Sequence, residues 1–378
     1  MRFTITSKQL SDVLVNMNRV INNMNALPIL ADVVFDVKDD NLSLKASDGE
    51  VTLVSNIAMT DNEGEGCFAI DGKTIMEAVK NQHDTPLTFS MDTENNGIVK
   101  IDYFSGFYSV PVDNADEYPT LPVMNANESK TFTMTEDILQ ENIARSVFAA
   151  ANDELRPVMN GIYFDLTKEY LAVVASDGHT LVRNKVLTIM AEDDKAGSFI
   201  LPKKPANILK NILNHTDNEV TVTFTDRQVS FTTSSFVLYC RLIEGRYPSY
   251  NSVIPKKNKN IVTVDRNAMV NALKRISPFS NFSSNLVRIH IETGKIQLDA
   301  EDWEFSKTAM EYLSCDYNGS TMDIGMKGSK TIEILSNIKA ENIEIHFADP
   351  SCAALILPVT QPEGMEILML QMPMLINS

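Results

Sequence analysis

Apolar residues recur at the three- and four-residue spacing of an amphipathic helix in six separate segments of the chain. In residues 7–22, for example, this spacing places Leu10, Val13, Leu14 and Met17 on one face. The six predicted helices span residues 7–22, 72–82, 135–152, 202–214, 265–277 and 328–339. Helices one, three and five start 128 and 130 residues apart, and helices two, four and six start 130 and 126 residues apart. One unit is therefore predicted to occur three times.

Between the helices, apolar and polar residues alternate in short runs that are typical of half-buried β-strands. Pairs of such runs joined by a polar turn predict β-hairpins at residues 32–46, 161–175 and 287–300. A further strand follows the second helix of each unit, at residues 87–92, 220–226 and 343–349. The predicted fold class is therefore α+β, with two helices packed on antiparallel sheets in each unit.

Two connectors, 111–122 and 242–255, each hold a Tyr-Pro pair between polar residues. Proline cannot donate a hydrogen bond to a sheet, so both connectors are predicted to be extended crossings between domains. The predicted domains are residues 1–123, 124–255 and 256–378.

The tetrapeptide Ala-Ser-Asp-Gly occurs twice, at 46–49 and at 175–178. Asp-Gly favours a tight turn between strands, and two copies 129 residues apart fit two repeats of one hairpin. The third unit has Ala-Glu-Asp-Trp at 300–303, where the turn is predicted to differ. The first copy continues into the charged Glu50, whereas the second continues into His-Thr-Leu at 179–181.

The composition is that of an ordinary globular protein of 378 residues, with 44% hydrophobic and 22% charged residues. The net charge of −17 speaks against nucleic-acid binding by the surface as a whole, because phosphate attraction requires Lys and Arg. The charge is unevenly distributed, however. The six predicted helices together carry +6, so the remainder of the chain carries −23. Positive charge is therefore concentrated on the predicted helices and negative charge on the rest of the chain.

Four widely separated cysteines, without a Cys-x-x-Cys or Cys/His cluster, predict neither a zinc site nor a disulfide framework. The chain has no apolar run of 18 residues and no signal peptide, so a reducing cytoplasm is the expected location. A nucleophile elbow, a P-loop, a zinc-protease helix and a dinucleotide-binding glycine motif are all missing. We therefore expect no catalytic residue, no metal and no cofactor.

Five segments, taken in order, resemble the bacterial β sliding clamp, the processivity ring of the replicative DNA polymerase. They are RPVMNGIYFD (156–165), ASDGHTLV (175–182), LPKKP (201–205), EGRYPSYNSVIP (244–255) and LQMPMLINS (370–378). The resemblance covers the whole chain and implies half of a head-to-tail dimeric ring, with helices lining the hole and sheets forming the outer wall. It also implies a non-catalytic protein that encircles double-stranded DNA of any sequence and tethers the polymerase.

The resemblance implies a hydrophobic pocket between the second and third domains, which receives short linear motifs from the polymerase, the clamp loader and repair proteins. Its residues, carried over position by position, are Met159, Ser176, Gly178, His179, Thr180, Leu181, Pro248, Ser252, Val253, Leu370, Met372, Pro373 and Met374. A Met-rich surface adapts to several partners, so alanine at Met372 and Met374 is expected to weaken peptide binding. Many clamps have arginine where Thr180, Ser252 and Leu375 stand, so a more apolar pocket is expected here.

Basic residues on or near the helices are the candidates for phosphate contact, and they are Lys80, Arg156, Lys203, Lys204 and Lys210. For each lysine the alternative is an ordinary solvated helix face. The resemblance further implies a joint between domains one and three of two subunits, with Tyr108 and Val110 on an edge strand facing Pro278 and Phe279. An ordinary core position is the alternative for Val110.

Two functions from other classes remain open on the residues alone. Asp177 and His179, two apart on an extended segment, can share a face as a carboxylate–histidine pair, which would suit a repeat-built hydrolase. The other alternative is a peptide-binding module that ignores DNA. A clamp differs from both by its dimeric mass and by remaining on circular DNA while leaving linear DNA.

Overall fold

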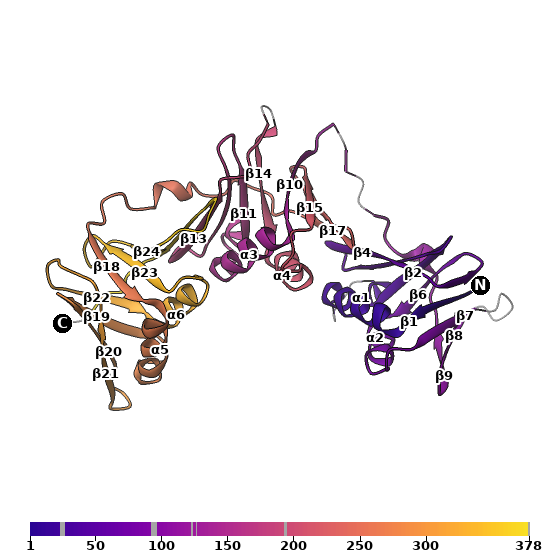
Figure 1. The fold of residues 1–378 in the computed structure, drawn as a ribbon, viewed down its shortest axis with the longest axis horizontal. Coiled ribbons are helices and arrows are strands. Elements are labelled where there is room, and N and C mark those ends of the chain that lie inside the picture. Colours follow the sequence, from indigo (N-terminus) through magenta and orange to yellow (C-terminus); the bar gives the residue numbers. More distant parts are fainter. Residues whose placement is uncertain (23–26, 92–96, 122–123, 126, 193–194, 377–378) are drawn as a thin grey trace. The chain divides into compact units, whose positions relative to one another are not determined.

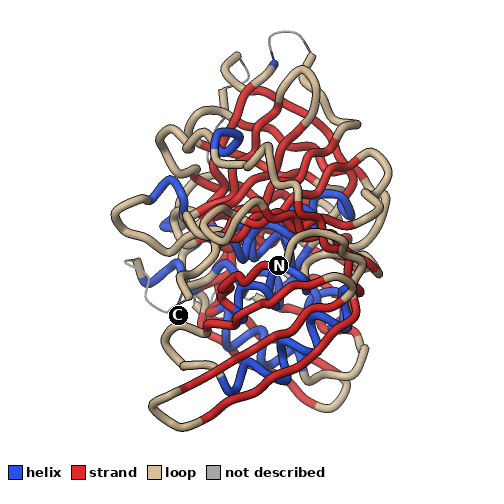
Figure 2. Tube along the Cα trace, turned by 90° about the vertical axis from the view of Figure 1, so that its left-hand side faces the viewer, coloured by secondary structure: helices blue, strands red, loops and turns tan. Residues whose placement is uncertain are grey.

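A computed structural model describes residues 1–22, 27–91, 97–121, 124–125, 127–192 and 195–376 (Figure 1). The predicted boundary residue 123 and the last two residues of the tail, 377–378, lie outside this description. Within it, one order of elements occurs three times: strand, helix, four strands, helix and three strands, with one short extra strand in the first copy. The predicted threefold repeat and the α+β class are therefore confirmed, and strands make up most of the regular secondary structure (Figure 2).

The three copies have the following elements. The first contains β1 (Arg2–Thr6), α1 (Ser7–Val20), β2 (Asp32–Lys38), β3 (Asn41–Ser47), β4 (Val51–Ala58), β5 (Asp61–Glu63), β6 (Gly66–Asp71), α2 (Gly72–Lys80), β7 (Pro86–Ser90), β8 (Ile98–Tyr103) and β9 (Gly106–Pro111). The second contains β10 (Lys130–Thr135), α3 (Glu136–Ser146), β11 (Gly161–Leu166), β12 (Leu171–Ser176), β13 (Thr180–Val186), β14 (Gly197–Pro202), α4 (Lys203–Ile212), β15 (Glu219–Phe224), β16 (Gln228–Thr232) and β17 (Phe236–Arg241). The third contains β18 (Asn260–Asp265), α5 (Arg266–Ile276), β19 (Leu286–Glu292), β20 (Lys295–Asp302), β21 (Lys307–Ser314), β22 (Met322–Lys327), α6 (Gly328–Ser336), β23 (Asn342–Phe347), β24 (Ala354–Pro358) and β25 (Met365–Gln371).

The helices form where the apolar spacing predicts them, and each ends one to six residues earlier than predicted. In α1, Leu10, Leu14 and Met17 are fully buried, whereas Val13 is only half-buried. The helix pair of the third copy, α5 and α6, lies side by side against the strands of that copy (Figure 1). Burial of one apolar stripe against a sheet supplies most of the stability of such short helices.

Side-chain caps fix where two of these helices begin. The Thr135 hydroxyl accepts a hydrogen bond from the Ile138 N–H at 3.3 Å, and the Asp265 carboxylate accepts one from the Ala268 N–H at 2.6 Å. The first N–H groups of a helix have no partner within the helix, so an oxygen at the preceding residue stabilises the start. Threonine and aspartate are residue types that favour this position, so the sequence at 135 and 265 accounts for both helix starts.

Antiparallel pairing builds two eight-stranded sheets, and each is shared by two successive copies. Their strand orders are β10-β15-β16-β17-β4-β3-β2-β6 and β18-β23-β24-β25-β13-β12-β11-β14. In the first sheet β17 pairs with β4, and Leu238 lies opposite Leu53. In the second sheet β25 pairs with β13, and Met369 lies opposite Val182. All four of these side chains are buried, so backbone hydrogen bonds and apolar packing act together at each joint.

Two smaller sheets have the orders β5-β1-β7-β8-β9 and β21-β20-β19-β22. In the part of the chain that the structure describes, no strand pairs with the outer edge of β9 or with the outer edge of β21. In the order of elements, β9 corresponds to β17 and β25, and β21 corresponds to β4 and β13. The third joint of the pattern is therefore left open at both ends of the chain.

The chain divides into two compact units, residues 1–140 with 207–242, and residues 141–206 with 243–378. The second copy is split between them: β10 and β15–β17 belong to the first unit, and β11–β14 belong to the second. The shared sheets explain this division, because hydrogen-bonded strands of neighbouring copies hold together as one body. The predicted domain limits follow the sequence repeat rather than these units.

The first connector is anchored on the sheet of its own copy. Asp113 pairs with Ala69 through two backbone hydrogen bonds of 3.1 and 2.9 Å. Tyr118 is buried, and its hydroxyl accepts a hydrogen bond from the Ser47 N–H at 2.6 Å. The Lys45 ammonium lies 4.8 Å from the centre of the Tyr118 ring. The sequence predicted only an extended crossing between domains. The structure shows in addition that Tyr118 anchors the connector on the sheet.

Two carboxyl groups meet where this connector joins the sheet. Burial of Asp32, followed by its hydrogen bond to Asp113 and the charge of Asp113, raises the pKa of Asp32 to about 7. Between about pH 4 and about pH 7, the folded state therefore holds a proton that the unfolded chain releases. The contribution of Asp32 to the free energy of unfolding decreases as the pH rises through this window, because the folded state must then bury a charge.

We expect Asp32→Asn to remove this pH dependence. Urea unfolding of the variant and the wild type at about pH 5 and about pH 8 should give a difference in unfolding free energy that favours the variant more at the higher pH. Asp84→Asn, at an exposed carboxylate, is the matched control and should show no such change. An equal difference at both pH values for Asp32→Asn would contradict the assignment.

Candidate functional site

An apolar cavity of about 180 Å³ lies in the second unit, where the β12–β13 turn, the second connector and the end of β25 meet. It is lined by Met159, Ser176, Gly178, His179, Thr180, Leu181, Tyr247, Pro248, Ser249, Tyr250, Val253, Leu370 and Met372. Leu181 and Leu370 belong to its buried floor, whereas Val253 and Met372 are 58% and 38% exposed at its rim. The structure thus brings ten of the thirteen predicted pocket residues to one cavity.

The other three predicted residues lie outside the lining. The Ser252 hydroxyl donates to the Ser249 carbonyl at 2.6 Å and closes the 3₁₀ turn Tyr250–Ser252. The Met374 N–H donates to the Gly325 carbonyl at 2.7 Å, which draws the tail, with Pro373, onto β22. The expectation that Met372 and Met374 both line the groove is therefore corrected, because only Met372 does so.

The Ala-Ser-Asp-Gly turn that forms one wall is fixed by its own side chains. The Asp177 carboxylate accepts hydrogen bonds from the His179 and Thr180 N–H groups at 2.9 and 2.6 Å, and Gly178 has a positive φ of 92°. The Ser176 hydroxyl accepts from the Gly178 N–H at 3.1 Å and donates to the Thr180 carbonyl at 2.8 Å. This network presents the His179 side chain to the cavity.

The first copy builds the same turn with the same bonds. The Asp48 carboxylate accepts from the Glu50 and Val51 N–H groups at 2.9 and 2.7 Å, and Gly49 has a φ of 91°. The rim differs, because Glu50 and Arg241 form an ion pair of 3.3 Å at the positions that correspond to His179 and Met372. Equal backbones therefore carry a charged pair in one copy and an apolar rim in the other.

Tyrosines from the second connector form a wall that the sequence analysis missed. The Tyr247 ring stacks on the Tyr163 ring with centroids 4.6 Å apart, and the Tyr250 hydroxyl donates to the Asp165 carboxylate at 2.9 Å. Burial, and then the charge of Asp165, raises the pKa of Tyr250. The available signal was the Tyr-Pro pair at 247–248, whose aromatic ring needs a packing surface.

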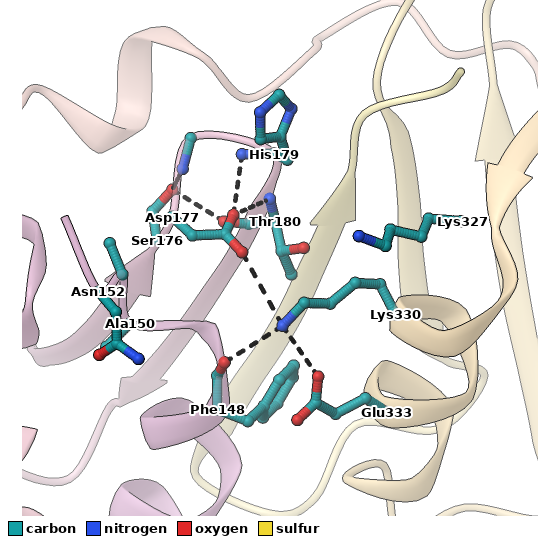
Figure 3. Close-up of polar contacts among 12 residues, drawn as sticks. Phe148, Ala150, Asn152, Ser176, Asp177, His179, Thr180, Lys327, Lys330 and Glu333 are labelled. Carbon is teal, nitrogen blue, oxygen red and sulfur yellow. Dashed lines mark hydrogen bonds and ion pairs between the residues drawn. The ribbon is translucent and has the colours of Figure 1, made fainter. Parts of the chain in front are cut away.

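A lysine of the third copy ties α6 to the pocket turn (Figure 3). The Lys330 ammonium lies 3.9 Å from the Asp177 carboxylate and 2.9 Å from the Glu333 carboxylate, and it donates to the Phe148 carbonyl at 3.5 Å. It is the His179 backbone N–H, and not its imidazole, that donates a hydrogen bond to the Asp177 carboxylate. The arrangement braces a binding surface and does not resemble a carboxylate–histidine pair prepared for proton transfer.

Two of the predicted phosphate contacts have structural partners. The Lys203 ammonium donates to the Ala150 carbonyl at 3.1 Å and to the Asn152 side chain at 3.0 Å. Burial, and then the nearby charge of Lys330, lowers the pKa of Lys203. Arg156 donates to the Asp153 carboxylate at 2.7 Å and lies beside the pocket turn. These contacts hold both side chains beside the pocket turn, and DNA contact by Lys203 and Arg156 stays a prediction.

The remaining basic candidates lie on helices. Lys80 is exposed at the end of α2, and Lys204 and Lys210 are half-exposed on α4. These positions agree with a solvent-facing helix surface, so phosphate contact by the three lysines stays a prediction.

The predicted interface residues lie at the open sheet edges. Tyr108 and Val110 are on the edge strand β9, where Tyr108 stacks on Tyr103 at 4.8 Å and Val110 is buried. Pro278 and Phe279 are exposed in a 3₁₀ turn that follows α5 and contacts the edge strand β21.

Among the described residues, no group of three or more His, Cys, Asp or Glu side chains is placed to hold a metal ion. None of the helices described is long and apolar enough to cross a membrane.

The fold and the site define a class of repeat proteins with three α+β copies. Neighbouring copies share a sheet through paired edge strands, and an apolar cavity lies beside one of these joints. Three domain families match along the chain: the N-terminal, central and C-terminal domains of the DNA polymerase III beta subunit, over residues 1–122, 133–249 and 251–374. The chain belongs to the DNA polymerase III beta subunit family.

Individual relatives agree with this assignment. The chain is 26% identical to the beta sliding clamp of Pseudomonas putida over 94% of its length and 95% of the relative, and 23% identical to that of Bacillus subtilis over 95% and 99%. A solved Pseudomonas aeruginosa sliding clamp bound to griselimycin superposes with a TM-score of 0.92 at 25% identity and full coverage of both chains. The beta subunit of Thermotoga maritima superposes with a TM-score of 0.89 at 26% identity, again with full coverage.

Proposed function

We propose that this protein is a DNA sliding clamp. Two copies close head to tail into a ring that encircles double-stranded DNA and tethers the replicative polymerase, the clamp loader and repair proteins through the apolar cavity. It is a non-catalytic processivity subunit with three domains, 1–123, 124–255 and 256–378. The observation that carries the proposal is the open third joint of a chain that closes the same joint twice within itself.

A second copy completes the pattern. If β9 of one subunit pairs with β21 of another subunit, the strand order is β1-β7-β8-β9-β21-β20-β19-β22. The corresponding elements follow in the same order in both eight-stranded sheets inside the chain. A long unpaired strand edge invites pairing with another chain, so an edge of this kind has to be covered. Each chain offers one edge of each kind, which is the requirement for a closed head-to-tail ring.

The internal joints also predict the register of the joint between copies. Leu238 lies opposite Leu53, and Met369 lies opposite Val182. The strand pairings within the first and third repeats show which residues occupy the equivalent positions on β9 and β21. They are Tyr108 and Ala309, which are therefore expected to lie opposite each other between two subunits. This register places Phe107 opposite Met310, which are 60% and 55% exposed in the single chain, so each buries the other.

A pair of cysteines tests this register. Ser109→Cys and Thr308→Cys, which the register places directly opposite each other, should link the two copies at both joints under mild oxidation. Non-reducing electrophoresis should then show a covalent dimer, because opposite residues lie at about 4.5–5.5 Å across antiparallel strands. Ser109→Cys with Ser314→Cys is the matched control, since its cysteines would stand about 20 Å apart along the strand. Equal linkage in both proteins would refute the register.

The uneven charge supports passage of DNA past the helices. The predicted helices carry +6 and the remainder carries −23, so phosphate is attracted to the helices and repelled elsewhere. The proposed contacts are Lys80, Arg156, Lys203, Lys204 and Lys210. No base-reading pattern accompanies them, so the contact is independent of sequence. Weak contact suits sliding, because topology holds the ring in place.

Retention on DNA distinguishes the clamp from a hydrolase or a peptide-binding module. After loading by the clamp loader onto a nicked circular plasmid, the protein should remain bound through gel filtration in about 0.15 M salt, where exposed ionic contacts are screened. Cutting the plasmid once should release it. Retention that is the same on linear and circular DNA, or a monomeric mass in solution, would leave the ring without support.

The cavity is the proposed docking site for peptides with a glutamine followed by aliphatic and aromatic residues. Its buried floor of Leu181 and Leu370 accepts apolar side chains, and the flexible Met372 at the rim adapts to different sequences. Because Thr180 stands where many clamps have arginine, aliphatic anchors are favoured over acidic ones.

We expect Met372→Ala to weaken the binding of a fluorescein-labelled peptide of this kind by about tenfold, since truncation of a rim anchor removes roughly 1.4 kcal/mol of apolar contact. Met374→Ala is the matched control and should leave the affinity unchanged, because Met374 lies outside the cavity. Fluorescence polarisation measures both, with griselimycin as a competitor. The same loss in both variants would argue for an effect of the whole tail instead of the cavity.

The replication role places the protein in the cytoplasm. This agrees with the cysteines, because Cys67, Cys240, Cys315 and Cys352 are all free thiols.

A further inference from the structure

A groove on the outer face of the third copy corresponds to a position that a tyrosine fills in the first two copies. In the first copy, Tyr118 lies over Lys45 and receives a hydrogen bond from the Ser47 N–H. In the second copy, Tyr247 stacks on Tyr163, and both pack in a cluster with Val174. Each tyrosine comes from a connector that follows the last strand of its copy. Two sister sites are therefore filled by an extended Tyr-Pro segment.

The strand ladders identify the same place in the third copy. Val34 pairs with Lys45 and Ala69, Tyr163 with Val174 and Ile200, and Arg288 with Asp299 and Gly325. Arg288 and Asp299 therefore correspond to the residues under the two tyrosines, and Glu301 corresponds to Ser47 and Ser176. The tail pairs with Gly325 through Met374, as the first connector pairs with Ala69 through Asp113.

No side chain of the described residues fills this third site. A cavity of about 630 Å³ lies there instead, and its lining is Asn281, Ser284, Leu286, Arg288, Gln297, Asp299, Glu301, Asp302, Trp303, Glu304, Leu375 and Ile376. Trp303 and Leu375, at the groove, are 85% and 92% exposed. Large apolar side chains standing this far out of the surface mark a contact site.

The chemistry of the groove selects a basic occupant. Four of its lining residues are carboxylates, and its one cation, Arg288, is already paired with Asp323 at 2.9 Å. Asp302 is only 3% exposed, and its Oδ1 has no hydrogen-bond partner among the described residues. A buried acceptor without a partner is unfavourable, so a donor from a ligand would be stabilised there.

We propose that this groove is a second docking site, independent of the apolar cavity, for an extended segment of another protein that carries a tyrosine flanked by Lys or Arg. The tyrosine lies where Tyr118 and Tyr247 lie in the sister sites, against Trp303 and Leu375. The flanking cations contact Asp299, Glu301 and Glu304. The site requires neither DNA nor ring closure, so it stands or falls separately from the proposed function.

Trp303 is the only tryptophan of the chain, so its fluorescence reports on this groove alone. The probe is the peptide Ile-Lys-Gly-Arg-Tyr-Pro-Ser-Tyr, which is residues 243–250 with Lys in place of Glu244. Titration into the full-length protein at fixed concentration should give a saturable blue shift of the Trp303 emission. Replacement of the first peptide tyrosine by alanine should abolish the shift.

Charge reversal separates a specific site from general attraction to an acidic protein. Asp299→Lys with Glu301→Lys should weaken peptide binding by about tenfold or more, since two ionic contacts become repulsive. Asp217→Lys with Asp226→Lys, which changes the net charge equally at exposed positions elsewhere, should bind as the wild type does. Met372→Ala, in the apolar cavity, should also bind normally.

A peptide with its two basic residues replaced by glutamate keeps the test decisive if the groove variant does not fold. The peptide Ile-Glu-Gly-Glu-Tyr-Pro-Ser-Tyr should bind the wild-type protein at least about tenfold more weakly than the basic one. Three results would overturn the proposal: an unchanged Trp303 emission, equal affinity of both peptides, or an emission shift on dilution of the protein alone, which would assign the groove to a second copy.

Discussion

Strand pairing at the sheet edges is the constraint on which the rest of this protein depends. The pairing of β17 with β4 and of β25 with β13 joins successive copies into continuous sheets. The boundaries of the two compact units follow those sheets and not the sequence repeat. Helices, turns and connectors then take positions that the sheets allow. Because backbone hydrogen bonds carry the joint, the side chains around it are free to differ between copies.

That freedom explains how one fold has acquired distinct surfaces. The Ala-Ser-Asp-Gly turn has nearly identical hydrogen bonds in two copies, yet Glu50 with Arg241 seals one joint while His179 and Met372 open a cavity beside the other. In the third copy the turn itself has changed and carries the exposed Trp303. Function has therefore diverged at equivalent points of an unchanged backbone.

Local patterns in the sequence predicted the local structure well. The spacing of Leu10, Leu14 and Met17 and the cap at Asp265 are properties of neighbouring residues, so they can be read directly. The shared sheets could not be read in this way, because β17 and β4 lie about 180 residues apart and nothing in either strand names its partner. The same limit explains why Tyr247 was missed at the cavity and why the carbonyl partners of Lys203 were not foreseen.

The connectors have a consequence for how a closed ring would come apart. Each of the two joints inside the chain is spanned by a covalent segment whose tyrosine is fastened to the sheet, as Tyr118 is by the Ser47 N–H. No peptide bond crosses between β9 of one subunit and β21 of the next. The two joints inside each chain are therefore strengthened by a covalent connector, and the joint between subunits is not. A ring under force would separate between subunits while each chain stays folded.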